Sequence, residues 1–236
     1  MVGNLECMTS PLIPDPVGQV PAAKRSAVLP ARVKPAVITV GSFGLLLVIV
    51  QLVNSLMSYR LNADYGLLSR SLHGLIGVLT APLLHANWAH LLSNLVPLLI
   101  FGLLIMLGSV RQFVAVTVLV WLVAGLGVWA FGPSNTITIG ASGLVFGWLA
   151  YLVTRGVFTR NLGQIAIGVV LLVLWGGVFW TGIVKVAVAD INHVVTISWQ
   201  GHLFGAIGGV LAAFLVAKAD GPRRKQPAPP ALTQPR

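Results

Sequence analysis

The chain has 236 residues, of which 56% are hydrophobic and only 8% are charged, and its mean hydropathy is +0.91. Soluble domains carry about 25% charged residues, so a soluble globular protein is excluded. The high apolar content also excludes disorder for most of the chain. The single cysteine, Cys7, rules out an intramolecular disulfide and a cysteine-based metal site. The composition is that of a polytopic membrane protein.

The charge balance is strongly basic, with 15 Lys and Arg against 5 Asp and Glu and a net charge of +10. No basic run is interleaved with aromatic residues, the pattern that binding of single-stranded nucleic acid requires. Lys and Arg in membrane proteins commonly anchor cytoplasmic loops and tails. We therefore expect a lipid bilayer as the partner and no nucleic acid.

Two Pro-rich, basic segments flank the apolar part of the chain. Residues 1–36 contain six prolines and a basic cluster, and they lack the apolar core of a secretory signal peptide. Residues 219–236 combine prolines with the run Arg223-Arg224-Lys225. We expect both segments to be disordered cytoplasmic tails around a membrane domain at residues 37–218.

Between the tails, apolar runs long enough for a bilayer-spanning helix recur. They predict an all-α membrane protein, a bundle of six transmembrane helices. The predicted spans are 37–58, 88–108, 112–131, 141–155, 162–183 and 200–218. The fourth run is short and begins with a Gly-rich sequence. It therefore predicts a helix that begins part-way into the membrane, beneath a loop that shields its non-helical lead-in.

The distribution of Lys and Arg predicts the orientation of these spans. With six spans, twelve Lys and Arg fall on the side of the two tails, and only Arg60, Arg70 and Lys185 fall on the other side. Such a bias predicts that both termini lie in the cytoplasm. We expect the protein to be located in the cell membrane. The first external loop, residues 59–87, is rich in Leu and Ile, so we expect it to lie in the interface or to pack against the bundle.

Polar side chains at membrane depth are costly, and they form three groups in this sequence. His85, His90 and Asn94 precede or begin the second span, Ser142 begins the fourth, and His202 begins the sixth. In the predicted topology all three groups lie on the external side at similar depth. We therefore expect them to converge on one site.

Glycines surround the serine and the last histidine. Gly140 and Gly143 flank Ser142, and Gly205 and Gly209 follow His202 on one helical face. Small residues at this spacing let two helices meet closely, which would bring the serine within hydrogen-bond reach of the imidazole. A serine needs such a base because its own pKa is far too high for attack at neutral pH. The alternative is that each side chain only makes a hydrogen bond within or between helices.

His90 and Asn94 lie four residues apart and therefore share a helical face. Their side-chain N–H groups are suited to stabilising an oxyanion. His85 would lie where the helix begins, hydrogen-bonded to the loop. The three residues could instead ligate a metal, although the lack of an intramembrane carboxylate or cysteine makes this weaker, and we expect no metal and no cofactor.

These motifs resemble the rhomboid family of intramembrane serine proteases over roughly residues 40–217, about three quarters of the chain. The matching residues are His85-x4-His90-x3-Asn94, Gly140-Ala141-Ser142-Gly143 and Gly201-His202-x2-Gly205-x3-Gly209. The resemblance implies that Ser142 is the nucleophile and His202 the general base of a dyad. It also implies an oxyanion hole made by His90, Asn94 and the backbone N–H of Ser142, and a membrane-embedded first loop at 59–87.

The sequence departs from the family pattern at two places. Many members have a tyrosine four residues after the nucleophile, stacked near the base, and this chain has Phe146. The Trp-Arg pair often found in the first loop is also missing. No acidic residue is an obvious third partner for Ser142 and His202. The alternative is that Asp190, in an external loop, approaches His202.

The resemblance implies an intramembrane endopeptidase that cleaves transmembrane helices of other proteins near their external ends. One alternative is a catalytically silent rhomboid-like protein that binds membrane clients. Another is a small-solute or metal transporter that uses His85, His90 and His202, against which the lack of inverted repeats counts. The sequence leaves the substrate and the oligomeric state open.

Overall fold

The computed structural model describes residues 33–190 and 198–220, and the backbone alone for residues 189 and 190. Most of the two predicted tails therefore lies outside the described residues. The first helix already begins at Val33 rather than at 37, and the last helix continues to Asp220 rather than ending at 218. The elements in chain order are α1 (Val33–Leu56), α2 (Arg60–Tyr65), β1 (Leu67–Leu68), η1 (His73–Leu75), α3 (Ile76–Thr80), η2 (Ala81–Leu83), α4 (Trp88–Met106), α5 (Val110–Phe131), β2 (Ile137–Thr138), α6 (Ser142–Thr159), α7 (Leu162–Phe179), η3 (Trp180–Lys185), α8 (Val186–Asp190) and α9 (Trp199–Asp220).

Each predicted span corresponds to a helix that begins within about four residues of the predicted start, namely α1, α4, α5, α6, α7 and α9. Polar residues set several of these starts. Asn87, Ser109 and Asn161 each accept a hydrogen bond from the backbone N–H three residues on, and so cap α4, α5 and α7. The fifth span ends later than residue 183, because α7, η3 and α8 follow one another without a break to Asp190.

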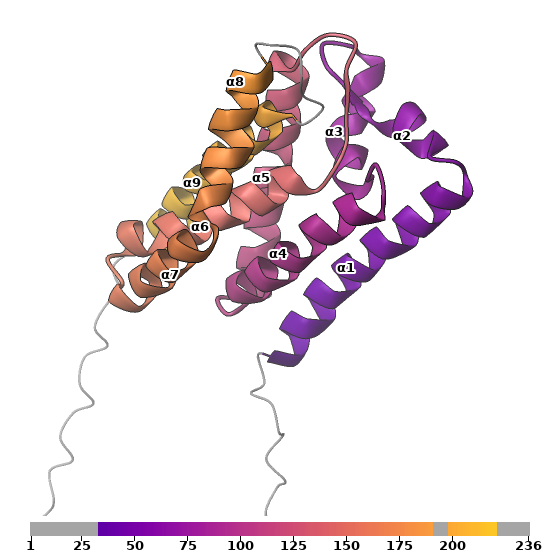
Figure 1. Cartoon of the computed structure of the whole chain (residues 1–236). Coiled ribbons are helices and arrows are strands. Elements are labelled where there is room, and N and C mark those ends of the chain that lie inside the picture. Colours follow the sequence, from indigo (N-terminus) through magenta and orange to yellow (C-terminus); the bar gives the residue numbers. More distant parts are fainter. Residues whose placement is uncertain (1–32, 191–197, 221–236) are drawn as a thin grey trace, which may run out of the picture.

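Five helical segments of the described chain are long and apolar enough to cross a membrane: Val33–Leu56, Trp88–Met106, Val110–Phe131, Leu162–Val188 and Trp199–Asp220. The chain is therefore a multi-pass helical membrane bundle. The remaining predicted span, α6, lies inside this bundle, where it contacts α4, α5, α7 and α9 (Figure 1). Polar residues such as Ser142, Thr154 and Arg155 lower its hydropathy, and a count of six spans stays a prediction.

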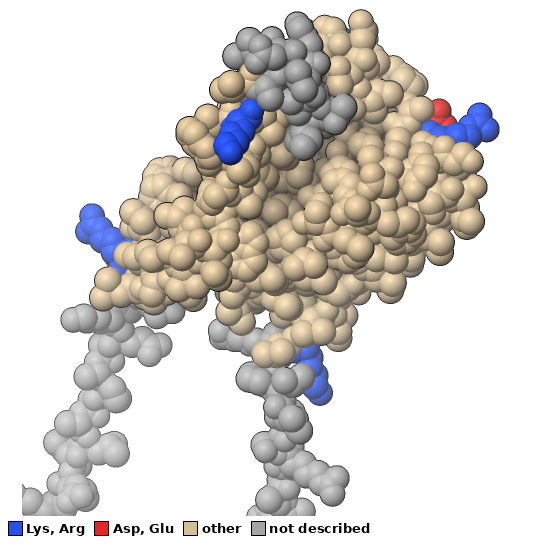
Figure 2. All heavy atoms as spheres, viewed as in Figure 1, with Lys and Arg blue, Asp and Glu red and all other residues tan. Residues whose placement is uncertain are grey.

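The outer surface of the bundle is apolar. Large hydrophobic side chains of α1, α4, α5, α7 and α9 are exposed, and the described charged residues on the face in Figure 2 are few and lie near its periphery. Such a surface suits hydrocarbon rather than water. The start of α1 and the end of α9 both lie toward the lower part of Figure 1.

Helices α6 and α9 run parallel and touch through glycine. A Cβ atom on Gly205 would overlap the carbonyl oxygen of Gly143, and one on Gly209 would overlap that of Gly147. The two backbones therefore meet with no side chain between them, as the spacing of these glycines predicts. At the far ends of the same helices, Arg155 of α6 forms a 2.8 Å ion pair with Asp220 of α9.

The segment between α1 and α4 packs against the bundle, as its apolar content predicts. Indole N–H groups of α5 hold it: Trp121 donates to the carbonyl of Val78 at 2.8 Å, and Trp129 donates to that of Ser71 at 2.9 Å. Its strand β1 pairs antiparallel with β2, the segment that leads into α6, with Leu67 opposite Thr138. The first loop is thereby fixed both to a transmembrane helix and to the lead-in of Ser142.

The glycine contact yields a test with a matched control. We expect Gly209→Ala to lower stability by about 1–3 kcal/mol, since its methyl group has no room beside the Gly147 carbonyl. Gly177→Ala adds the same methyl group in α7, where nothing lies within 4 Å, and should be neutral or slightly stabilising. Thermal unfolding in detergent measures both. Equal melting temperatures for the two variants would contradict the close contact.

Candidate active site

Ser142 is the first residue of α6, at the end of an extended lead-in. Gly140 takes φ +117°, a backbone conformation that disfavours other residues, and its N–H donates to the carbonyl of Ala81 at 2.9 Å. The His90 ring lies against Gly140, so that a Cβ there would come within 2.9 Å of its Nε2. The turn that presents Ser142 is therefore held by the first loop and α4 together. Like the other N–H groups of a first helical turn, the N–H of Ser142 has no acceptor within its own helix.

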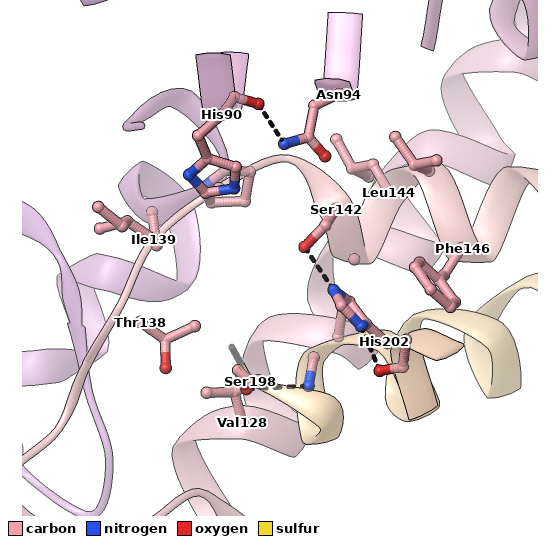
Figure 3. A pocket seen from close by; sticks show the side chains of 18 of the residues that line it. His90, Asn94, Val128, Thr138, Ile139, Ser142, Leu144, Phe146, Ser198 and His202 are labelled. Carbon is pink, nitrogen blue, oxygen red and sulfur yellow. Dashed lines mark hydrogen bonds between the residues drawn. The ribbon is translucent and has the colours of Figure 1, made fainter. Parts of the chain in front are cut away.

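His202 lies in the first turn of α9 and is largely buried, with 6% of its surface exposed. Its Nε2 is 2.9 Å from Ser142 Oγ, and its Nδ1 is 2.7 Å from the carbonyl oxygen of Gly182 in η3 (Figure 3). A carbonyl can only accept, so Nδ1 carries the proton of the neutral ring. Nε2 is then left with a lone pair that accepts the hydrogen bond of the serine hydroxyl.

Phe146 packs face to face with the His202 ring. The ring centroids are 4.1 Å apart and the planes are inclined by 2°, while Phe179 of α7 approaches Phe146 edge-on at 5.7 Å. The expected stacking position is thus occupied by a phenylalanine, and the imidazole is held by an aromatic face on one side and two hydrogen bonds at its edges.

His90 and Asn94 face Ser142 from α4 (Figure 3). The N–H of Ala86 donates to His90 Nδ1 at 3.4 Å, so the proton of a neutral His90 ring is on Nε2, beside Gly140. Asn94 Nδ2 donates one hydrogen bond to the His90 carbonyl at 2.9 Å. An amide nitrogen has two hydrogens, so a second N–H of Asn94 remains as a donor.

These side chains surround a cavity of about 1130 Å³. Ser142, His202, His90 and Asn94 all line it, together with the extended segment 136–140. Gly143 and Phe146 also line it, whereas Gly205 and Gly209 lie behind it in the contact between α6 and α9. The structure thus brings the three polar groups of the sequence together around one hollow in an apolar bundle.

His85 has a different position from the other predicted site residues. It lies in the loop before α4, is fully buried, and its ring meets His90 edge-on at 5.1 Å. Its Nε2 accepts a hydrogen bond from the N–H of Ala141 at 3.4 Å. His85 therefore supports the residue that precedes Ser142 from behind the cavity.

Three groups at the site were missed by sequence reasoning. The Gly182 carbonyl, which contacts His202, is a backbone group and leaves no mark in the sequence. Ser198 lines the cavity and accepts the N–H of Gly201 at 3.2 Å, which caps the start of α9. The side-chain amide of Asn54 donates to Asn62 Oδ1, and Nδ2 of Asn62 donates in turn to the His85 carbonyl. The polarity of Asn54 within an apolar run is the signal that would have drawn attention to it.

Two alternatives from the sequence concern other groups. In the part of the chain that the structure describes, no three His, Cys, Asp or Glu side chains approach closely enough to hold a metal ion. The alternative third member of the catalytic group, Asp190, has a described backbone at the end of α8, but its side chain lies outside the described residues.

The pKa of His85 gives a prediction for stability. Burial, with a smaller contribution from the charge of His90, lowers this pKa to about 4, against about 6.5 for a free histidine. Between these values the unfolded chain binds a proton that folded His85 excludes, so stability falls as the pH falls through this window. We expect the melting temperature to fall between pH 7 and pH 5, and to fall less in His85→Gln. The full window corresponds to at most about 3 kcal/mol.

The control for this experiment is His73→Gln, because the His73 side chain is exposed. It should retain the pH dependence of the unsubstituted protein. The same slope in His85→Gln as in His73→Gln would show that His85 does not contribute.

Comparison with known proteins agrees with this geometry. The family described as the Rhomboid domain matches residues 72–219. An uncharacterized protein of Mycobacterium tuberculosis is 42% identical over 192 residues, which are 79% of this chain and 76% of that protein. An uncharacterized protein of Mycobacterium leprae is 40% identical, over 80% and 73% of the two chains. Rhomboid-like protein 11, chloroplastic, of Arabidopsis thaliana is 32% identical, over 59% and 51%. The chain belongs to the rhomboid family.

Proposed function

We propose that this protein is an intramembrane serine endopeptidase in which Ser142 is the nucleophile and His202 the general base. The observation that carries the proposal is the 2.9 Å hydrogen bond between Ser142 Oγ and His202 Nε2, at the wall of a cavity inside the bundle. A serine hydroxyl becomes a useful nucleophile when an adjacent base accepts its proton as it attacks. Membership of the rhomboid family supports the same reaction class.

The reaction follows from the roles of these two side chains. Ser142 Oγ forms a bond to the carbonyl carbon of the substrate while its proton passes to His202 Nε2. The tetrahedral intermediate collapses, the C–N bond breaks, and His202 gives the proton to the departing amine. A water molecule then attacks the acyl-enzyme, with Nε2 taking its proton, and the carboxylic acid product leaves as Ser142 recovers its hydrogen.

The negative oxygen of the intermediate needs donors that are already in place. The second N–H of Asn94, the Nε2–H of His90 and the backbone N–H of Ser142 are the groups available around the nucleophile. All three belong to α4 or α6, whose buried side chains form much of the hydrophobic core. We assign them to the oxyanion hole.

The substrates would be transmembrane helices of other proteins, cleaved near their external ends. A peptide bond within a helix is shielded by its own hydrogen bonds, so the helix must unwind before attack. Residues of low helix propensity near the cut, such as glycine, would favour this step. This proposal includes the predicted placement of the protein in a cell membrane, with six spans and both tails in the cytoplasm.

Labelling with a fluorophosphonate probe tests the activated serine. We expect the unsubstituted protein in detergent to become labelled, and Ser142→Ala and His202→Ala to remain unlabelled although both stay folded. Ser93→Ala is the matched control, because Ser93 also lines the cavity yet donates only to the His90 carbonyl. It should label normally. Absence of labelling in the folded, unsubstituted protein would favour the client-binding alternative.

The oxyanion role of Asn94 can be separated from substrate binding. We expect Asn94→Ala to lower kcat about 10² to 10³-fold with little change in KM, because the lost donor acts on the transition state. Cleavage rates at several substrate concentrations measure both constants. A rise in KM with kcat unchanged would show that Asn94 binds the substrate instead.

A further inference from the structure

The helix that begins with α7 changes its winding beside the candidate site. Residues Trp180–Lys185 form η3, a π-helical turn between α7 and α8. Such turns are rare and occur frequently at functional sites. Here the wide turn lies against the first part of α9, where His202 is located.

The contact between the two is made by a backbone carbonyl. The Gly182 oxygen lies 2.7 Å from His202 Nδ1. Any larger residue at this position would be excluded, because its Cβ would overlap the ring of Phe146 and lie 3.2 Å from Nδ1. Glycine thus lets the turn approach the stacked pair of Phe146 and His202 from the side.

A neutral histidine serves as the base for Ser142 only if Nε2 carries the lone pair. The ring nitrogen that bears the proton is determined by the partner of the other nitrogen. The carboxylates with described side chains do not supply that partner: Asp64 lies in α2, and Asp220 pairs with Arg155 at the far end of α6. The Gly182 carbonyl occupies the position that an acidic side chain has in a triad.

We propose that the Gly182 carbonyl is the positioning group of the general base, which holds His202 as the Nδ1–H tautomer and fixes its ring toward Ser142. This inference rests on the proposed function, since it assigns the third partner of the same dyad. It also ties the base to a lightly packed helix: Gly168 and Leu171 are the buried residues of α7, and η3 has no buried residue. A displacement of η3 that breaks this hydrogen bond would allow the proton of the His202 ring to move from Nδ1 to Nε2.

A backbone ester tests the carbonyl without changing a side chain. Replacement of Ile183 by its α-hydroxy analogue turns the Gly182–Ile183 amide into an ester, whose carbonyl is a weaker acceptor. The matched control is the same replacement at Val173, on the outer face of α7, where the side chain is 79% exposed. Each ester also removes one helical N–H, so both variants share that loss.

Nitrogen-15 spectra of protein labelled at histidine report which ring nitrogen carries the proton, and the spectrum of His202→Gln identifies the His202 signals. In the unsubstituted protein and in the Val173 ester we expect the Nδ1–H tautomer. In the Ile183 ester we expect a larger fraction of the Nε2–H tautomer than in the Val173 ester, and a several-fold slower labelling of Ser142 by fluorophosphonate. A purely structural role of Gly182 would not change the tautomer.

The proposal is overturned if the Ile183 ester keeps both the tautomer and the labelling rate of the Val173 ester. It is equally overturned if the unsubstituted protein already holds the Nε2–H tautomer, a result that requires no variant to fold. A tautomer that responds to the Ile183 ester in a protein whose serine never labels would support the positioning role while contradicting the proposed protease activity.

Discussion

The site depends on the direct contact of two backbones, those of α6 and α9. Gly205 and Gly209 of α9 face the carbonyls of Gly143 and Gly147 so closely that a single methyl group would not fit. This parallel contact sets the distance from Ser142, at the start of α6, to His202, at the start of α9. Because the two side chains are short, an added separation of even one ångström between the helices would break the 2.9 Å hydrogen bond.

The other elements hold this pair in place inside an apolar bundle. The first loop, anchored by the indoles of α5, fixes the turn before Ser142 through the carbonyl of Ala81 and the ring of His85. Helix α4 brings the amide of Asn94 to the other side of the hydroxyl. Polar groups that would be costly next to lipid thereby bond to one another, Ser142 to His202 and Asn94 to the carbonyl of His90, and they line one shared cavity.

Much of this arrangement could be predicted from the sequence, because each feature has a local signal. Apolar runs indicated the helices, and glycines four residues apart on two runs indicated which helices meet. The remainder depends on groups without such a signal. Gly182 acts through its backbone, the π-helical turn has no distinctive composition, and the first loop is held by tryptophans that lie about fifty residues away in the sequence. The fourth predicted span has a weaker signal in the sequence, because α6 is enclosed by other helices and can therefore carry polar residues that lower its hydropathy.

The reaction proposed for this bundle is the hydrolysis of peptide bonds within membrane helices. The most direct measurement reconstitutes the protein in liposomes with a set of single-span reporter helices that carry glycine near one end, and identifies the fragments by mass spectrometry. We expect a cut inside the apolar segment of at least one reporter, near its external end, and no cut with Ser142→Ala. The same fragments from both proteins, or intact reporters throughout, would contradict it.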